Sequence, residues 1–472
     1  GSYQALAGSE VVMSFNAIFR GTSFSTTGDG VVRALAGNNL EWHDVINSGL
    51  VVVDANTDLR VHGTIANVGT ITLPTVGSAA DIELGGNVLL TGGGIVNMTG
   101  LASRINAIGD FTLTNVSNTI QGSGNIGGNQ ARFVNLALID ANDVSEPLVI
   151  DPRSGGVGVV TFDNQNIAQA TAGATLRLPG NAGGEFGGTG TYQALAGSAV
   201  ELIAGAVARD TTFDTEGDGL VRTGSSDNIE FHDVTNNGNL QISNNSDLRM
   251  HGTITNSGHI AVASTASAAD FELGGDVTLN GGGTVTFSGP IATVNAIGDF
   301  TLTNLDNTLH GTGNIGANLA RIANQGHVEA RTGELLRIDP RSGGAGMATV
   351  DNQNVVQALG GGTTELSGNA GGECGGSGTY IAQDGSEVVL ITNAIARNTT
   401  FDSAGTGLVR TGTSQNIEFH DVTNQGTLQI SNNSDLRMHG TITNAGTIAI
   451  ASTGNNARFE LGSSILLTGG GT

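Results

Sequence analysis

The sequence predicts an all-β fold, a parallel β-helix (β-solenoid) that forms one continuous rod with coils of about 20–28 residues. Three observations lead to this class. Glycine contributes 75 of the 472 residues, whereas aromatic residues make up only 4% and charged residues 13%. Short motifs recur at two fixed periods along the whole chain. No segment shows the apolar spacing of an amphipathic helix.

The composition dictates the kind of core. A chain with so few large side chains must bury Val, Ile, Leu and Ala, and its many glycines place a turn signal every few residues. Such a chain favours thin, repeated β layers over a single thick core. We therefore expect a narrow interior filled by small aliphatic side chains.

The longer period is about 188 residues, the length at which whole segments of the sequence return. "NLEWHDVIN" stands at 39–47, and "NIEFHDVTN" stands at 228–236 and again at 416–424. No linker-like composition separates the copies, which indicates one uninterrupted body. The predicted long repeats are 1–189, 190–377 and a partial third copy, 378–472.

The shorter period comes from the pattern Asn-x-Gly-x-apolar-x-apolar. Alternating apolar residues indicate a strand with one buried face, and the preceding Asn and Gly indicate a turn because both tolerate positive φ. At a coil corner, each Asn amide is expected to bond to the equivalent amide one coil away, forming a structural ladder. Its predicted members are Asn47, Asn67, Asn236, Asn256, Asn324, Asn424 and Asn444.

One turn and one strand within each short period describe one coil of a solenoid. Stacked coils pair through parallel ladders spaced about 4.8 Å apart. Roughly twenty coils would then give a rod on the order of 95 Å long.

The sequence pattern of "TNSGHIAV", "TNAGTIAI" and "GGDVTLNGGGTVTF" resembles the β-strand repeats of filamentous-haemagglutinin-like and autotransporter-type bacterial surface adhesins. The resemblance extends over essentially the whole chain. It implies a right-handed β-helix within a long exported protein that serves adhesion or forms fibres. It brings no catalytic residues.

Two histidines, His232 and His251, are separated by close to one coil length, so their imidazoles are expected to stack on adjacent coils. The same spacing recurs in the other two copies. One interpretation is a metal site completed by Asp233 or Asp247. The interpretation adopted is a stacked polar pair without metal, because three copies along one body suit a scaffold better than an enzyme.

Two further features carry chemistry in other proteins. "IDPRSGG" places Asp151 beside Arg153 and recurs at 338–344, but it lacks the additional carboxylates of a calcium-dependent lyase site, so an internal Asp–Arg pair is expected. The single cysteine, Cys374, excludes an intrachain disulfide and is expected to be a small packed residue.

The formal net charge is −24 and the sequence contains no lysine, so nucleic acids and anionic membranes are poor partners. No apolar run is long enough for a transmembrane helix, and no membrane insertion is expected. The chain opens with Gly-Ser and ends within "LLTGGGT", which suggests a fragment of a longer protein.

The predicted function is that of a structural or adhesive segment of a large secreted bacterial surface protein, located outside the cell. It would form a rod, stalk or fibre through end-to-end or lateral self-association, with cell-surface carbohydrate as a further candidate partner. It is predicted not to be an enzyme and to need no cofactor, with calcium the one open alternative. The competing hypotheses are a polysaccharide-active β-helix enzyme and a carbohydrate- or calcium-binding module.

Overall fold

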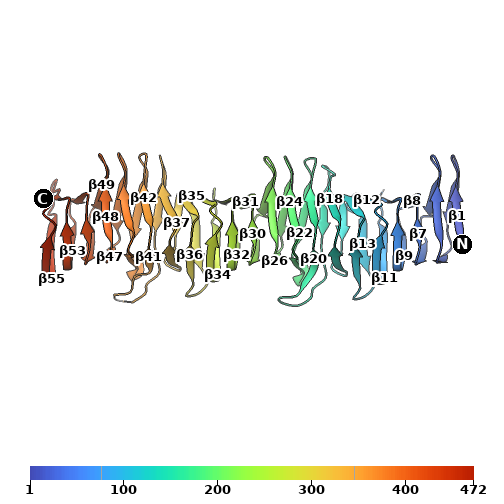
Figure 1. The fold of residues 1–472 in the computed structure, drawn as a ribbon, viewed down its shortest axis with the longest axis horizontal. Helices are drawn as coiled ribbons and strands as arrows, with labels where there is room; N and C mark the ends of the chain where they lie inside the picture. The colour runs from blue at the N-terminus through green and yellow to red at the C-terminus, as the bar shows by residue number, and fades with distance from the viewer. Residues whose placement is uncertain (76, 345) are drawn as a thin grey trace. The chain divides into compact units, whose positions relative to one another are not determined.

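The computed structural model describes residues 1–75, 77–344 and 346–472 (Figure 1). The chain is a β-solenoid of about 20 turns, which confirms the predicted all-β class of stacked parallel coils. The helices among the described residues are two three-residue 3₁₀ turns, η1 (Asn181–Gly183) and η2 (Asn369–Gly371). In the described ranges no helix has the length and apolarity needed to cross a membrane.

The chain divides into two compact units, 1–240 and 241–472, which are described separately. The predicted boundaries of the long sequence copies, near 189 and 377, lie inside these units. The sequence repeats and the compact units therefore have different boundaries.

The strands of unit 1 stack in three parallel columns. Column A contains β1 (Ser2–Ala5), β4 (Ser23–Thr26), β7 (Ile46–Asn47), the second halves of β9 (Thr57–Asn67) and β11 (Ala80–Thr91), β14 (Thr112–Asn115), β17 (Arg132–Asn135), β20 (Val160–Asn164), β23 (Glu185–Gly187), β26 (Val207–Arg209) and β29 (Asn228–His232). Column B contains β2 (Glu10–Met13), β5 (Val31–Ala34), β8 (Leu50–Val53), β10 (Thr70–Pro74), β12 (Ile95–Thr99), β15 (Thr119–Gly122), β18 (Leu138–Ala141), β21 (Ile167–Ala170), β24 (Thr191–Ala194), β27 (Thr212–Thr215) and β30 (Thr235–Asn236). Column C contains β3 (Ile18–Arg20), β6 (Asn39–His43), the first halves of β9 and β11, β13 (Ser103–Ala107), β16 (Gly124–Ile126), β19 (Leu148–Ile150), β22 (Thr175–Pro179), β25 (Ala199–Ile203) and β28 (Leu220–Thr223). Strand β31 (Asn239–Ile242) spans the boundary between the units.

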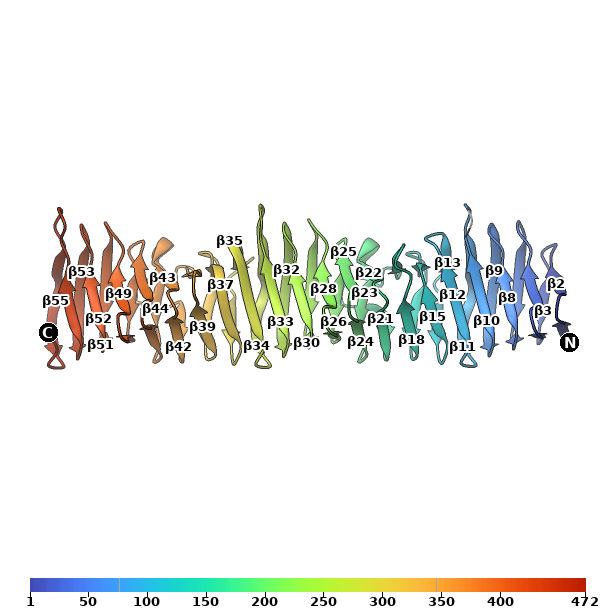
Figure 2. The ribbon, with the colours of Figure 1, turned by 90° about the horizontal axis from the view of Figure 1, so that it is seen from above.

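Unit 2 has the same construction, with the strands of each column running parallel (Figure 2). Column D contains β33 (His259–Ala263), the first halves of β35 (Thr284–Ala296) and β37 (Thr308–Ile315), β39 (His327–Ala330), β42 (Val355–Ala358), β45 (Thr379–Ala382), β48 (Thr400–Ser403), β51 (Thr423–Asn424) and the second halves of β53 (Asp435–Asn444) and β55 (Arg458–Thr468). Column E contains the first halves of β32 (Ser246–Asn256) and β34 (Ala269–Asn280), the second halves of β35 and β37, β40 (Leu335–Ile338), β43 (Thr363–Ser367), β46 (Glu387–Ile391), β49 (Leu408–Thr411), β52 (Thr427–Ile430) and β54 (Thr447–Ile450). Column F contains the second halves of β32 and β34, β36 (Thr301–Asn304), β38 (Arg321–Asn324), β41 (Val350–Asn352), β44 (Glu373–Gly375), β47 (Ile395–Arg397), β50 (Asn416–His420) and the first halves of β53 and β55.

Coil length varies more than the sequence period indicates. In column B, Thr119 pairs with Leu138, and Leu138 pairs with Ile167, so the second of these two coils is much longer than the first. The longer coil includes the segment 151–159, where Val157 is 97% exposed. Extra residues therefore leave the coil as a loop, and the paired strands keep their register.

The long repeat and the coil are out of phase. Strand β1 is the first strand of column A, whereas its sequence copy β24 is the ninth strand of column B. One long repeat thus holds eight coils and one third of another. Within unit 2 the same offset places the first half of β32 in column E and the first half of its copy β53 in column F. Equivalent side chains of successive copies therefore lie on different faces.

The interior is filled mainly by small aliphatic side chains, as predicted, but it also holds large aromatic rings. The largest fully buried side chains include Trp42, Tyr192 and Tyr380 together with nine phenylalanines. The rings of Phe213 and Phe231 stack with centroids 5.1 Å apart, and offset stacks of this kind add to burial. Most aromatic residues of the described chain are buried in this way, and several rings stack on a ring from the adjacent coil, as Phe133 does on Phe162.

Candidate functional site

Two of the predicted asparagines of unit 1, Asn47 and Asn67, lie at the corner that follows column A. Asn47 and Asn67 are fully buried, and the amide nitrogen of Asn47 donates to the side-chain oxygen of Asn67 over 2.8 Å. Asn67 donates in turn to Asn118 over 2.9 Å. The Asn47 amide also donates to the Gly49 carbonyl, so one side chain satisfies both its own turn and the next coil.

The ladder continues beyond the predicted members. Asn115 donates to Asn135 over 3.0 Å, and Asn135 donates to Asn164 over 2.9 Å. Asn118, in the turn after β14, donates its backbone N–H to the side chain of Asn115 and so joins the two runs. All of these side chains are buried, so each amide depends on its neighbours for its hydrogen bonds.

Unit 2 repeats this ladder at two corners. Asn304 donates to Asn324 and Asn324 donates to Asn352, both over 3.0 Å. After column D, Asn424 donates to Asn444 over 2.8 Å.

The remaining two predicted members are also buried. Asn236, in unit 1, donates to the Gly238 carbonyl over 3.1 Å. Asn256, in unit 2, donates to Asn307 over 2.9 Å. Asn280, a weaker match to the motif, pairs in register with Thr255, one residue away from the ladder position.

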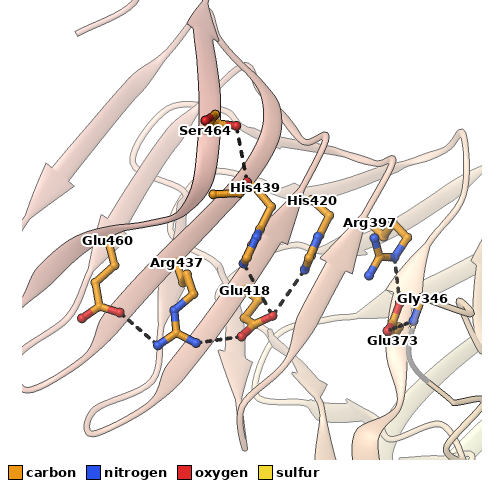
Figure 3. A network of polar contacts seen from close by, with 10 residues as sticks. Gly346, Glu373, Arg397, Glu418, His420, Arg437, His439, Glu460 and Ser464 are labelled. Atoms are coloured by element: carbon orange, nitrogen blue, oxygen red, sulfur yellow. Dashed lines mark hydrogen bonds and ion pairs between the residues drawn. The ribbon is translucent and has the colours of Figure 1, made fainter.

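A second polar cluster lies on the outer surface of unit 2 (Figure 3). It brings together Glu418 and His420 of β50 with Arg437 and His439 of β53 and with Glu460 of β55. The two imidazole rings stack with centroids 4.2 Å apart and planes 4° apart. Both Nε2 atoms face one carboxylate oxygen, Glu418 Oε2, at 3.3 Å from His420 and 3.8 Å from His439.

Unit 1 contains the same arrangement in the first long repeat. Glu41 and His43 lie on β6, and Arg60 and His62 lie on the neighbouring β9. The rings of His43 and His62 have centroids 4.1 Å apart and planes 1° apart. His43 Nε2 lies 3.1 Å from Glu41 Oε2. Within each cluster, one carboxylate oxygen and one nitrogen from each ring lie within 4.8 Å of one another.

The strand pattern explains why these side chains meet. In "NLEWH", Leu40 and Trp42 point into the core, so Glu41 and His43 emerge side by side on the outer face. Register places His62 directly above His43. The following coil has Gly85 beside the His62 ring, where a Cβ atom would collide with the imidazole.

Burial and neighbouring charges alter the protonation of the cluster. The pKa of His62 is lowered, first by burial and then by the positive charge on His43. The pKa of His420 is also lowered, by burial and by the charge of Arg397. The pKa of Glu41 is lowered mainly by its hydrogen bond with His43. The imidazoles of His62 and His420 thus favour the neutral form, the form that can donate a lone pair to a metal.

The two histidines chosen from the sequence, His232 and His251, belong to different units. Within unit 1, His232 Nε2 lies 3.4 Å from Glu230. Within unit 2, His251 is on the same strand as Arg249, which forms an ion pair with Glu272 over 2.7 Å.

The carboxylates that lie beside the histidines are not the aspartates named in the alternative metal interpretation. Asp233 lies in the turn after β29 with φ of 53°. Its copies Asp44 and Asp421 accept backbone N–H groups from strands of the next coil, those of Thr64 and Thr441. Asp247 instead pairs in register with Asp270. The carboxylate beside each first histidine is a glutamate two residues earlier, and the sequence signal that could have found it is Glu-x-His within one strand.

The "IDPRSGG" residues and the cysteine have structural surroundings. Arg153 forms an ion pair with Asp110 over 2.9 Å, whereas Asp151 is buried and bonds to Asn125 and Asn181, so the predicted Asp151–Arg153 pair gives way to other partners. Burial raises the pKa of the Cys374 thiol to about 12, which leaves it protonated and unreactive at neutral pH.

Comparison with protein-family models, curated proteins and solved structures finds no match for this chain.

Proposed function

We propose that the chain is a structural segment of an exported bacterial surface protein, a solenoid stalk or fibre unit that projects adhesive parts away from the cell. The observation that carries this proposal is the one-third-turn offset between the long repeat and the coil. Within each unit, equivalent strands of successive copies lie in different columns, so equivalent side chains do not line up along one face as the subsites of a substrate groove would. This arrangement suits a spacer or a filament.

One pair of surface grooves supports the same role, because its two members lie at corresponding positions of successive long repeats. A groove in unit 1 is lined by Gly183, Val207 and Asn228. Its counterpart in unit 2 is lined by Gly371, Ile395 and Asn416 at the corresponding positions of the next long repeat. An enzyme usually has one distinctive cleft, so duplicated shallow grooves favour a function without catalysis.

The mechanism is mechanical. Each coil contacts only its neighbours, so length is added by further coils without redesign of a core. The buried asparagine ladders and aromatic stacks hold coils together, and a net charge of −24 favours solubility. Outside the cell, the stalk would meet other copies of itself or surface carbohydrate.

Electron microscopy and small-angle scattering of the purified chain test this role. The expected result is an elongated particle on the order of 95 Å, alone or joined into fibres, as about 20 coils at about 4.8 Å require. A compact particle would contradict the stalk. Incubation with acidic polysaccharides is the parallel assay, and turnover at enzyme-like rates would replace the structural role by the catalytic one.

A further inference from the structure

We propose that the repeated Glu–His–His cluster is a binding site for a divalent transition-metal ion, with zinc as the best match. The ligands are Glu41, His43 and His62 in unit 1. The corresponding ligands in unit 2 are Glu418, His420 and His439. The middle sequence copy carries the same residue types at Glu230, His232 and His251.

Three potential ligand atoms lie close together in each cluster. In unit 2, both imidazole Nε2 atoms face the same oxygen of Glu418, but His439 is too distant from it for a hydrogen bond. Nε2 of His439, like Nε2 of His62 in unit 1, is buried and has no hydrogen-bond partner among the residues that the structure describes. A cation placed between the carboxylate and the two rings would satisfy all three atoms.

The ligand types select the ion. Imidazole nitrogen and carboxylate oxygen together suit zinc and its neighbours in the transition series, whereas calcium prefers six to eight oxygen ligands. Two histidines and one glutamate leave a fourth tetrahedral position for water or a donor from outside the cluster.

Only a small movement is needed to form the site. The ligand atoms already lie within 4.8 Å of one another, and a tetrahedral ion with Zn–N bonds of about 2.0–2.1 Å brings its nitrogens to about 3.3 Å. Rotation of the two rings about their Cβ–Cγ bonds would have to supply this change. The His43 side chain is 18% exposed, so an ion can enter from solvent.

Neighbouring charges position the carboxylate. Arg437 lies 3.0 Å from Glu418 Oε1, while the histidines face Oε2, so the arginine holds one oxygen and turns the other toward the rings. Arg60 occupies the same place in unit 1, at 3.7 Å from Glu41 Oε1. The nearby cation Arg397 is neutralised by Glu373 at 2.8 Å.

The site also makes sense of the stacked histidines, because its ligands come from two adjacent coils. A bound ion would tie β6 to β9 in unit 1 and β50 to β53 in unit 2. It would therefore raise the thermal unfolding midpoint of the full chain, since the unfolded chain does not hold the ligands together.

The experiment is zinc binding to the full chain, measured by calorimetry and by metal analysis after dialysis. The parent is expected to retain at least two equivalents of zinc, and the double variant His62→Gln/His439→Gln is expected to lose two of them. The matched control, His310→Gln/His327→Gln, removes two histidines outside the clusters and should keep the parent's zinc content. Zinc K-edge absorption of the parent should show nitrogen and oxygen ligands at about 2.0–2.1 Å.

Two results would overturn the proposal: a parent that retains fewer than two equivalents, or a double variant that retains the parent's full content. Circular dichroism of each variant without zinc checks that the variant is folded, so that a lower zinc content cannot result from unfolding. If the double variant fails to fold, the single variants Glu41→Gln and Glu418→Gln serve in its place, each expected to lose one equivalent. Loss of zinc binding would leave the stalk proposal intact, because particle shape is measured separately.

Discussion

The inner asparagine ladder and the outer Glu–His–His cluster join adjacent coils of the same solenoid, yet they differ in what surrounds them. Asn135 is fully buried and exchanges hydrogen bonds with the amides above and below it. The outer cluster is half-buried, and Glu418 and Arg437 are 30% and 45% exposed. The inner groups have no access to water, whereas the outer groups compete with it continuously.

This difference distinguishes residues that stabilise the fold from surface residues that are available to bind a ligand. A buried polar group that loses its partner costs its full desolvation penalty, while an exposed ion pair contributes on the order of 0–1 kcal/mol. We therefore infer that the inner ladder stabilises the coil stack. The outer cluster occurs in both units, and we expect such partly exposed groups to contribute little to folding, which is consistent with a binding role.

The largest effect is expected when a charge is introduced into the inner asparagine ladder, which tests whether this ladder stabilises the coil stack. Asn256→Asp replaces an amide that donates to the Thr284 carbonyl and to Asn307. One oxygen of the new carboxylate would replace the Nδ2 donor and face these two acceptors, so we expect the free energy of unfolding to fall by about 3–5 kcal/mol at pH 7. Chemical denaturation measures the loss. The exposed Asn455→Asp carries the same charge change and should stay within about 0.5 kcal/mol of the parent.

A second test concerns a buried carboxylate whose ion-pair partner is partly exposed, a case between the inner ladder and the outer cluster. Asp81 is buried and held by two hydrogen bonds from Arg104, of 2.8 and 2.6 Å. Arg104→Gln would leave this carboxylate stacked on Asp58 without a counter-charge, and we expect a loss of about 2 kcal/mol because the arginine is partly exposed.

The second long repeat already lacks this arginine, since Thr293 pairs with Asp270 at the corresponding position. Thr293→Arg should therefore be neutral or stabilising. A stabilising effect of Arg104→Gln, or a loss from Thr293→Arg as large as that from Arg104→Gln, would show that the pairing does not matter. Urea unfolding of both variants measures the difference.

Much of the inner ladder could be predicted from the sequence. The Asn-x-Gly motif placed Asn47, Asn67 and Asn324 at coil corners, because a turn preference followed by alternating apolar residues specifies both the turn and the buried face. Asn118 escaped prediction because it reaches the ladder from the turn after β14.

The outer cluster and the offset were harder to predict. The sequence indicated stacked histidines but directed attention to Asp233, a turn residue, instead of Glu230, which shares a strand face with His232. The one-third-turn offset depends on how many residues each coil takes, and an average period cannot distinguish the short coil that ends at Leu138 from the long coil that follows it. The aromatic stacks were missed because composition reports how many rings exist and not where they gather.

Aspartates that pair in register on adjacent coils, Asp58 with Asp81 and Asp247 with Asp270, lead to a prediction about pH. The pKa of Asp58 is raised by burial and by Asp81, and the pKa of Asp270 is raised by burial. A raised pKa means that the folded state holds the proton more tightly, so these groups favour folding at low pH. Their contribution is lost as the pH rises through the folded pKa.

Asp270→Asn removes the charge and should raise stability at pH 7 by up to about 1 kcal/mol, with a smaller gain near pH 4. Melting curves at both pH values measure the two gains. A larger gain at pH 4 than at pH 7 would contradict the assigned direction.

The smallest effect is expected in the outer cluster itself. Glu418→Gln removes the carboxylate that His420 and Arg437 contact, but all three side chains remain reachable by water. In the presence of a chelator, we expect a change of about 0.5 kcal/mol or less in the free energy of unfolding. Glu460→Gln is the matched control, because it removes the other carboxylate of Arg437 without touching a histidine. Equal, small effects from both variants would show that Glu418 is not needed for the fold, so that any selective loss of zinc in Glu418→Gln reports on binding. A loss of several kcal/mol from Glu418→Gln alone would place this cluster with the inner ladder, as a structural element of the coil stack.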